Sequence, residues 1–233
     1  MQDSRIAQLN KLLRLLFKSH PWHGMPPGDC MPDVLNAYIE IVPNDTVKYE
    51  IDKSSGHLKV DRPQKYSNFC PTLYGFIPQT YCGQNVGNYC SEQIGRQGIK
   101  GDGDPLDICV LSERSISHGD ILLKVIPIGG LRMLDGDEAD DKILAVLCND
   151  SVYGHWQDIS ECPKPLIDRL RHYFLTYKDL PESARSSVEI TAVYPRTEAV
   201  EVVNASLKDY NAEFGDPDRR IEALISTIQS MMK

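Results

Sequence analysis

The chain lacks the features of membrane-spanning and secreted proteins. Nowhere in its 233 residues does an apolar run approach the roughly 20 residues that a membrane-spanning helix needs. The first residues also lack the pattern of a secretory signal peptide. We therefore expect no membrane association and a cytoplasmic location.

An excess of basic residues is also missing. The chain has 25 Lys and Arg against 33 Asp and Glu, which gives a formal net charge of −8. General binding to nucleic acid or to a membrane surface depends on a basic surface. The composition therefore disfavours both functions, and we expect no nucleic-acid partner.

Cysteine pairs with the spacing of zinc or redox motifs are absent. The seven cysteines form an odd set, and none of them make a C-x-x-C pair. We expect reduced thiols, as is usual in the cytoplasm. A disulfide or a metal site at Cys82 and Cys90 is the alternative for that pair.

The first residues have the apolar spacing of a helix. In "RIAQLNKLLRLLFKSH" one helical face would carry Ile6, Leu9, Leu13, Leu16 and Phe17. A cleaved organelle transit peptide has a similar pattern. Asp3 and the shortness of the stretch favour a surface helix instead. Residues 1–35 are thus predicted to be an N-terminal helix and a proline-rich connector.

Short alternating segments then predict a mainly β fold. We expect strands in "NAYIEIVP", "TVKYEID" and "GHLKVDRP", with a turn at 52–56, and further strands at 106–111, 119–128 and 142–148. Residues 77–101 are polar and glycine-rich, without periodicity. They therefore predict a long loop.

The second half of the chain adds helices to these strands. A helix is expected at 163–178, another strand in "SSVEITAVYP" and two helices in 196–233. Many short strands followed by helices are typical of a small, mostly antiparallel barrel with helices outside, in the α+β class. With no internal repeat or linker, we expect one domain over 1–233. Its barrel core would span 36–195 and would contain the 77–101 loop.

Three carboxylates are crowded into "GDGDPLDICVL" at 101–111. Asp102 and Asp104 are two residues apart, so in an extended chain they point the same way, and Asp107 begins the apolar strand on the opposite parity to its apolar neighbours. Two carboxylates ~4 Å apart repel by roughly 4 kcal/mol at an effective dielectric constant of 20. A fully solvated loop would avoid this repulsion, but the attached strand makes a bound cation the better interpretation.

The ligand chemistry indicates which cation. An all-oxygen set suits Mg²⁺, Mn²⁺ or Ca²⁺ rather than zinc. A calcium EF-hand is excluded, because the sixth position counted from Asp102 is Asp107 where that loop requires glycine. The segment "LDGDEADD" at 134–141 is a second acidic candidate.

Clustered Mg²⁺ sites commonly act on phosphate, which also needs fixed cations and hydroxyl donors. The chain offers side chains of this kind, although each alone is compatible with an ordinary surface or core position: Lys48, Arg62, Tyr74, Tyr177 and Lys178.

Taken together, these motifs resemble the soluble family-one inorganic pyrophosphatases. "GDGDPLDICVL" matches the family's Asp-x-Asp-Pro-apolar-Asp pattern. "YIEIVP", "VKYEID", "YGFIPQTY", "LDGDEADDKILAV" and "HYFLTYKDL" follow the family's order over roughly residues 24–195. "HPWHG" and "FIPQTY" are more similar to the longer, eukaryote-like branch. The resemblance implies a closed five-stranded barrel of the oligonucleotide-binding (OB) type, surrounded by helices.

The resemblance also implies an activity and a set of roles. The reaction would be Mg²⁺-dependent hydrolysis of pyrophosphate to two orthophosphates by a water shared between metal ions, with Mn²⁺ or a similar ion able to substitute. Asp104 would orient and deprotonate this water, and Lys142 would support the acidic cluster from behind. The implied metal ligands are Asp102, Asp107, Asp135, Asp140, Glu50 and Glu40. The implied phosphate-binding residues are Lys48, Arg62, Tyr74, Tyr177 and Lys178.

Two positions depart from the family pattern. Cys70 stands four residues before Tyr74, where the family usually has a tyrosine. The family's basic residue after the Tyr-Lys pair has only Arg185 as a candidate here. An inactive, metal-stabilised relative is therefore one alternative function. An OB-type binding module is the other, because similar barrels bind single-stranded nucleic acid. Family members differ in assembly, so a homo-oligomer is also compatible with the sequence.

Overall fold

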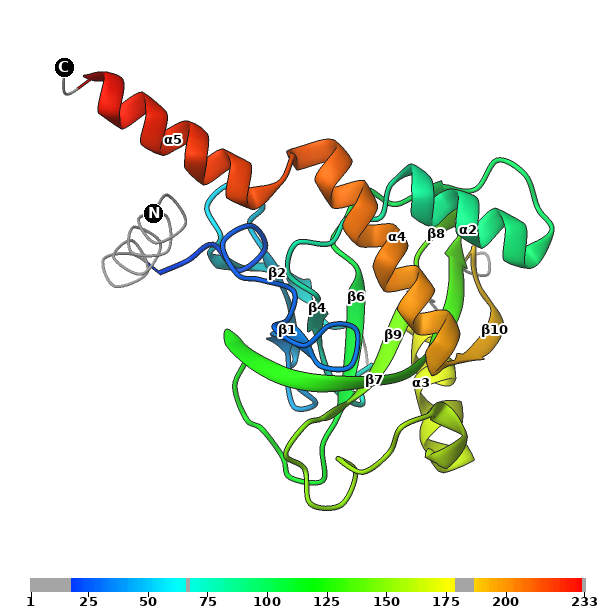
Figure 1. Cartoon of the computed structure of the whole chain (residues 1–233). Helices are drawn as coiled ribbons and strands as arrows, with labels where there is room; N and C mark the ends of the chain where they lie inside the picture. Colours follow the sequence, from blue (N-terminus) through cyan, green and yellow to red (C-terminus); the bar gives the residue numbers. More distant parts are fainter. Residues whose placement is uncertain (1–17, 66–67, 179–186, 232–233) are drawn as a thin grey trace.

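The fold is mainly β, with helices packed around the strands, as the sequence predicts (Figure 1). The computed structural model describes residues 18–65, 68–178 and 187–231. The predicted N-terminal helix lies outside these residues. The strands of the large sheet are β1 (Leu35–Ile41), β4 (Leu73–Phe76), β5 (Lys100–Gly101), β6 (Asp107–Leu111), β7 (Ile121–Asp135), β8 (Glu138–Ala139), β9 (Lys142–Leu147) and β10 (Val188–Pro195). A separate hairpin consists of β2 (Val47–Ile51) and β3 (Leu58–Pro63).

Strand β1 pairs with two neighbours, β4 and β7. The pairings therefore run from β1 through β4, β6, β9 and β7 and return to β1. Most of these pairs are antiparallel, but β6 and β9 are parallel. The parallel register sets Asp107 beside Lys142.

Helices cover the strands on different sides (Figure 1). They are α2 (Gln84–Ile94), α3 (Lys164–Thr176) and α4 (Arg196–Phe214), with a short 3₁₀ turn, η1 (Ile159–Glu161). The last helix, α5 (Pro217–Met231), projects away from the strands (Figure 1). Helices α2 and α4 pack on one apolar cluster, to which Ile108 and Val110 belong. Helix α3 packs on another, to which Cys109 and Leu111 belong. Alternate residues of β6 thus face different clusters, as the expected parity requires.

The prediction of a long loop over 77–101 is wrong, because α2 occupies much of this segment. The carboxylate of Asp209, on α4, accepts hydrogen bonds from the backbone N–H groups of Gly83, Asn85 and Val86. It satisfies donors that a helix start otherwise leaves unpaired. The capping group lies more than a hundred residues away in the sequence, so the local pattern could not indicate it.

The second difference concerns β7, which was expected to end near residue 128. It continues to Asp135 through a register shift between Pro127 and Gly129. Proline cannot donate to a strand partner, so proline and glycine together indicated an ending. A bulge accommodates both and lets the strand bend. Figure 1 shows β7 curving beneath the other strands.

The remaining expected elements are confirmed. The first three strands, the helix at 163–178, the strand in "SSVEITAVYP" and two C-terminal helices all form close to their predicted bounds. The connector is ordered from residue 18, and the indole of buried Trp22 donates to the Thr80 carbonyl oxygen at 2.7 Å. In the described part of the chain, no helix combines the length and apolar character needed to cross a membrane.

Candidate active site

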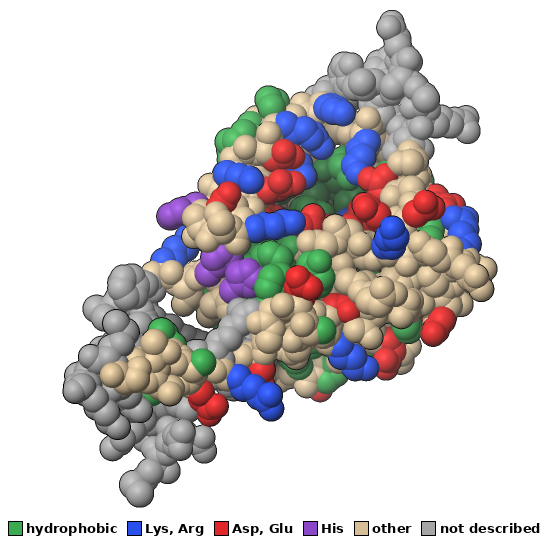
Figure 2. All heavy atoms as spheres, turned by 90° about the horizontal axis from the view of Figure 1, so that it is seen from above, with side chains coloured by type: hydrophobic (Ala, Val, Ile, Leu, Met, Phe, Trp, Pro, Cys, Tyr) green, Lys and Arg blue, Asp and Glu red, His purple; other side chains and the backbone are tan. Residues whose placement is uncertain are grey.

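A polar pocket of about 280 Å³ opens where the β2–β3 hairpin, the 101–107 segment, the 135–142 segment and the end of α3 meet. Figure 2 shows acidic and basic side chains gathered around a hollow. All thirteen residues predicted to form the site line this pocket: Glu40, Lys48, Glu50, Arg62, Tyr74, Asp102, Asp104, Asp107, Asp135, Asp140, Lys142, Tyr177 and Lys178.

The 101–107 segment is fixed by local turns and by the backbone of Cys82. Gly103 has a φ of 75°, a left-handed conformation that glycine adopts without strain. The backbone N–H of Asp104 donates to Asp102 Oδ1 at 2.9 Å. The N–H of Cys82 donates to the Asp104 carbonyl oxygen at 2.8 Å, and Gly103 donates to the Cys82 carbonyl oxygen at 3.0 Å. These bonds present both carboxylates to the pocket.

Asp107 and Asp140 meet around one buried ammonium group. Lys142 Nζ lies 2.5 Å from Asp107 Oδ2 and also contacts Asp140. Tyr74 donates its hydroxyl to the same Asp107 oxygen at 2.5 Å. The strand β4, which carries Tyr74, pairs with β6, and β6 pairs with β9, so three neighbouring strands position these groups.

Asp135, at the end of β7, is reached from α3. Its carboxylate contacts Lys178 and accepts a hydrogen bond from the Ser187 hydroxyl at 2.6 Å. The end of α3 is therefore attached to the second acidic segment. Tyr177 precedes Lys178 and stacks against Tyr173 with 5.4 Å between ring centres.

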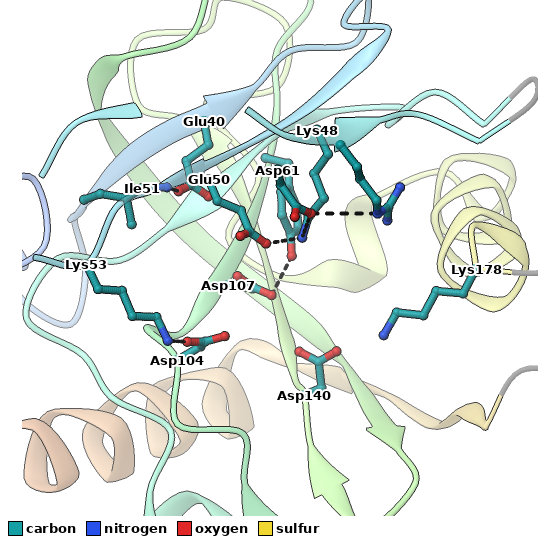
Figure 3. A network of polar contacts seen from close by, with 12 residues as sticks. Glu40, Lys48, Glu50, Ile51, Lys53, Asp61, Asp104, Asp107, Asp140 and Lys178 are labelled. Carbon is teal, nitrogen blue, oxygen red and sulfur yellow. Dashed lines mark hydrogen bonds and ion pairs between the residues drawn. The ribbon is translucent and has the colours of Figure 1, made fainter. Parts of the chain in front are cut away.

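The β2–β3 hairpin supplies the remaining groups (Figure 3). Lys48 contacts Glu50 and lies 3.2 Å from Asp61. Glu40 is buried on β1, and its Oε1 accepts a hydrogen bond from the Ile51 backbone at 2.6 Å. Figure 3 shows the side chains of Lys178, Asp104 and Asp140 directed toward one space.

Comparison with known proteins identifies this arrangement. The sequence profile of the family described as inorganic pyrophosphatase matches residues 37–211. The chain belongs to the inorganic pyrophosphatase family. It is 55% identical to an inorganic pyrophosphatase of Chlamydia trachomatis, over 82% of this chain and 94% of the relative. A soluble inorganic pyrophosphatase of rice is 34% identical, over 83% of this chain and 80% of the relative.

Solved structures of the family show the same fold. The crystal structure of the inorganic pyrophosphatase from Thermus thermophilus superposes with a TM-score of 0.68 and 32% identity, covering 82% of this chain and 99% of that protein. Bacterial and plant family members thus align over similar lengths of this chain. Its assignment to the longer, eukaryote-like branch stays a prediction.

Burial and mutual repulsion shift the pKa values of the pyrophosphatase carboxylates. Burial raises the pKa of Glu40 to about 8. Burial, with Asp140 and Asp107 nearby, raises the pKa of Asp102 to about 8. Burial alone would lower the pKa of Lys142, but Asp107 and Asp140 raise it well above its ordinary value. Crowded carboxylates of this kind favour additional positive charge.

The residues fit a hard divalent cation by their chemistry, since every candidate ligand is a carboxylate. Among the residues that the structure describes, no three His, Cys, Asp or Glu side chains are already arranged around one point as a metal site. Lysines instead contact the carboxylates: Lys142 neutralises Asp107 and Asp140, and Lys178 neutralises Asp135.

The structure adds pocket residues that sequence reasoning missed. Lys53, within the 52–56 turn, contacts the Asp104 carboxylate, and Glu138 and Tyr173 also line the pocket. Turn chemistry explained the 52–56 segment completely, so nothing in the sequence pointed to Lys53. Tyr173 lies on α3 beside Phe174, and no motif in the sequence had singled it out.

The two departures from the family pattern have different outcomes. Cys70 is 1% exposed and does not line the pocket, and burial raises the pKa of its thiol to about 11. It is therefore an unreactive buried group close to Thr72 and Tyr173. Arg185 lies outside the described residues.

Proposed function

We propose that the chain hydrolyses inorganic pyrophosphate to two orthophosphates in this pocket, with Mg²⁺ as the metal. The observation that carries the proposal is the convergence of two acidic segments and of cations from β2, β3 and α3 on one space. In the reaction, a water oxygen forms a bond to one phosphorus and the bridging P–O bond breaks. The second phosphate leaves with the bridging oxygen.

The metal ligands would be the carboxylates of the two acidic segments and of the hairpin region: Asp102, Asp107, Asp135, Asp140, Glu50 and Glu40. Divalent ions held there supply positive charge to the phosphoryl oxygens and lower the pKa of the attacking water. Mn²⁺ also accepts carboxylate ligands, so it can substitute for Mg²⁺. Lys142 supports the set by holding Asp107 and Asp140 in place from the buried side.

Asp104 acts as the general base. Its carboxylate is half exposed at the pocket and, unlike Asp107 and Asp140, contacts a flexible exposed lysine, Lys53. It can therefore turn to a bound water, orient it and take its proton. Asp104 is fixed through its backbone, which accepts a hydrogen bond from Cys82.

The phosphoryl groups are held by the cations and hydroxyls opposite the acidic segments: Lys48, Arg62, Tyr74, Tyr177 and Lys178. The cations neutralise the charge that develops on the leaving phosphate, and the hydroxyls orient its oxygens. Catalysis is then positioning and electrostatic stabilisation, without a covalent phosphoenzyme.

We also propose a barrel type, a set of partners and a cellular location for the chain. The circuit of five pairings from β1 back to β1 supports a closed five-stranded OB-type barrel within one domain. The net charge of −8 disfavours nucleic acid as a partner, and pyrophosphate and phosphate are the partners that the proposed reaction requires. The odd number of cysteines without a C-x-x-C pair supports a cytoplasmic location. Light scattering will show whether the chain forms a homo-oligomer.

The test is phosphate release from magnesium pyrophosphate by the wild type, Asp104→Asn and Asp137→Asn. Asp137 is exposed in the same acidic stretch and does not line the pocket, so it is the matched control. We expect Asp104→Asn to lower kcat about 10²–10⁴-fold and Asp137→Asn to match the wild type. A folded but inert wild type would favour an inactive metal-stabilised relative. Oligonucleotide binding at physiological salt would favour a binding module.

A further inference from the structure

A second group of buried charges lies on the other side of the strands, away from the pocket. We call Arg132, Asp141, Tyr194 and Glu198 the Arg132 cluster. Arg132 is 2% exposed and Asp141 is 3% exposed. The cluster joins β7, the start of β9, β10 and the first turn of α4. None of its members line the pocket.

The contacts within the Arg132 cluster are specific but incomplete. Arg132 Nη1 lies 2.6 Å from Glu198 Oε1, and the Tyr194 hydroxyl donates to Asp141 Oδ2 at 3.0 Å. The guanidinium lies 4.9 Å from the centre of the Tyr194 ring and 5.4 Å from that of Tyr89. Arg132 Nη2 approaches Asp141 Oδ2 only to 3.6 Å, which is too far for a hydrogen bond.

Three polar atoms of the cluster have no hydrogen-bond partner among the described residues. They are Arg132 Nε, Arg132 Nη2 and Asp141 Oδ1, all of them buried. A buried polar atom left unpaired destabilises the fold. A buried ion pair is also often no more stable than apolar residues of similar volume. Folding stability therefore does not account for the Arg132 cluster.

The position of Asp141 links the cluster to the pocket. Side chains alternate along an extended segment, and Asp140 and Lys142 line the pocket while Asp141 lies between them and contacts Tyr194 of β10. The Asp140 backbone N–H donates to the Met133 carbonyl oxygen at 3.0 Å, and Lys142 pairs with Leu131. Arg132 lies between Met133 and Leu131 on β7, so the two charges anchor the same short section of both strands.

We propose that Arg132 and Asp141 are positioning residues, which fix the directions of Asp140 and Lys142 and so set the affinity of the pocket for divalent cations. Glu198 extends this anchor to α4, which Figure 1 shows lying across the sheet. The inference rests on the proposed function in one respect, that Asp140 is a metal ligand. It does not require the chain to hydrolyse pyrophosphate.

The test measures Mg²⁺ binding without substrate, by isothermal titration of the full chain, beside urea unfolding in EDTA. The variants are Arg132→Met, Asp141→Asn and the double variant Arg132→Met with Asp141→Leu. Glu198 is 22% exposed at its side chain and can turn to solvent in the double variant. Asp209→Ala is the control, because it removes a buried carboxylate from α4 that caps the start of α2 and belongs neither to the pocket nor to the Arg132 cluster.

We expect each single variant to weaken Mg²⁺ binding about 10-fold or more, as loss of a group that orients a ligand does. The double variant regains stability in EDTA, since both unpaired charges are gone, yet binds Mg²⁺ as weakly as the single variants. Asp209→Ala loses stability without losing Mg²⁺ affinity.

Mg²⁺ affinity equal to that of the wild type in the double variant would overturn the proposal. Arg132 and Asp141 would then not be needed to position the metal ligands. Equal weakening in Asp209→Ala, or no Mg²⁺ binding by the wild type, would overturn it as well. A wild type that binds Mg²⁺ but releases no phosphate contradicts only the proposed function.

Discussion

Lys142 is the most deeply buried charge in the pocket. Its side chain is 2% exposed, and its ammonium group lies between two carboxylates. Removing one partner from a buried ion pair leaves the other as a buried charge without a counter-ion. The stability of this residue's surroundings therefore depends on a cation being present.

We expect Lys142→Met to lower the free energy of unfolding in EDTA by about 3–5 kcal/mol. The cause is the unpaired charge of Asp107 and Asp140 rather than lost volume, since methionine fills a similar space. Urea unfolding measures the effect. Lys164→Met is the control, because its exposed pair with Asp168 on α3 contributes less than about 0.5 kcal/mol. Equal effects of the two substitutions would show that the Lys142 contacts are weak.

The candidate site could be predicted from sequence wherever a motif fixes spacing. Asp102 and Asp104 are two residues apart, so strand geometry predicted their common direction, and Asp107 was recognised because its parity is opposite to that of its apolar neighbours. Asp135 and Lys178 were weak candidates until the family resemblance linked them, since nothing local brings the end of β7 to the end of α3. Lys53 had no signal of either kind.

At the scale of elements, α2 depends on a single remote carboxylate. Asp209 is 4% exposed and caps the start of the helix. We expect Asp209→Ala to lower the free energy of unfolding by about 1–3 kcal/mol, because buried N–H donors are left unpaired. Urea unfolding measures the loss, with Glu213→Ala as the control because Glu213 is an exposed position on α4, the helix that carries Asp209. An unchanged stability would mean that water replaces the cap.

The pairing of β1 with β4 depends on a glycine. A Cβ at Gly75 would overlap the carbonyl oxygen of Tyr38, a backbone atom that cannot turn away. We expect Gly75→Ala to lower the free energy of unfolding by about 3 kcal/mol or more, and to displace Tyr74 from Asp107. Chemical denaturation and activity test both effects. Gly95→Asn is the control, since Gly95 ends α2 in open space with a φ of 68° that asparagine tolerates. A soluble, fully active Gly75→Ala protein would contradict the packing argument.

The elements that sequence predicted well are those whose signal is local. Strand β6 alternates between two apolar clusters, and α3 repeats its apolar residues with helical spacing, so both were recognisable. Helix α2 has few apolar residues and a distant cap, and β7 passes through Pro127 and Gly129. In both α2 and β7, tertiary contacts allow a helix or strand to form where the local sequence indicates that none would form or continue.

At the scale of the whole molecule, the two acidic segments lie on different strands and meet only in the folded chain. A ligand that binds the folded state alone stabilises it, by about 2.7 kcal/mol for one site at 100 times its Kd. We expect saturating Mg²⁺ to raise the Tm by roughly 5–10 °C in a chain of this size. Calorimetry against sodium chloride of matched ionic strength measures the shift. The same shift in sodium chloride, or in Asp102→Asn, would exclude specific binding.

The lysines that contact the pocket carboxylates have a practical consequence for handling the protein. Because Asp107, Asp135 and Asp140 already contact lysine ammonium groups, the polypeptide should survive purification and storage in a chelating buffer as an intact but inactive species. When magnesium is restored, it would take over the carboxylates, and the ammonium groups of Lys48, Lys53 and Lys178 would become available to bind an anion. The metal-free form would thus remain folded, and addition of magnesium would activate it without a refolding step.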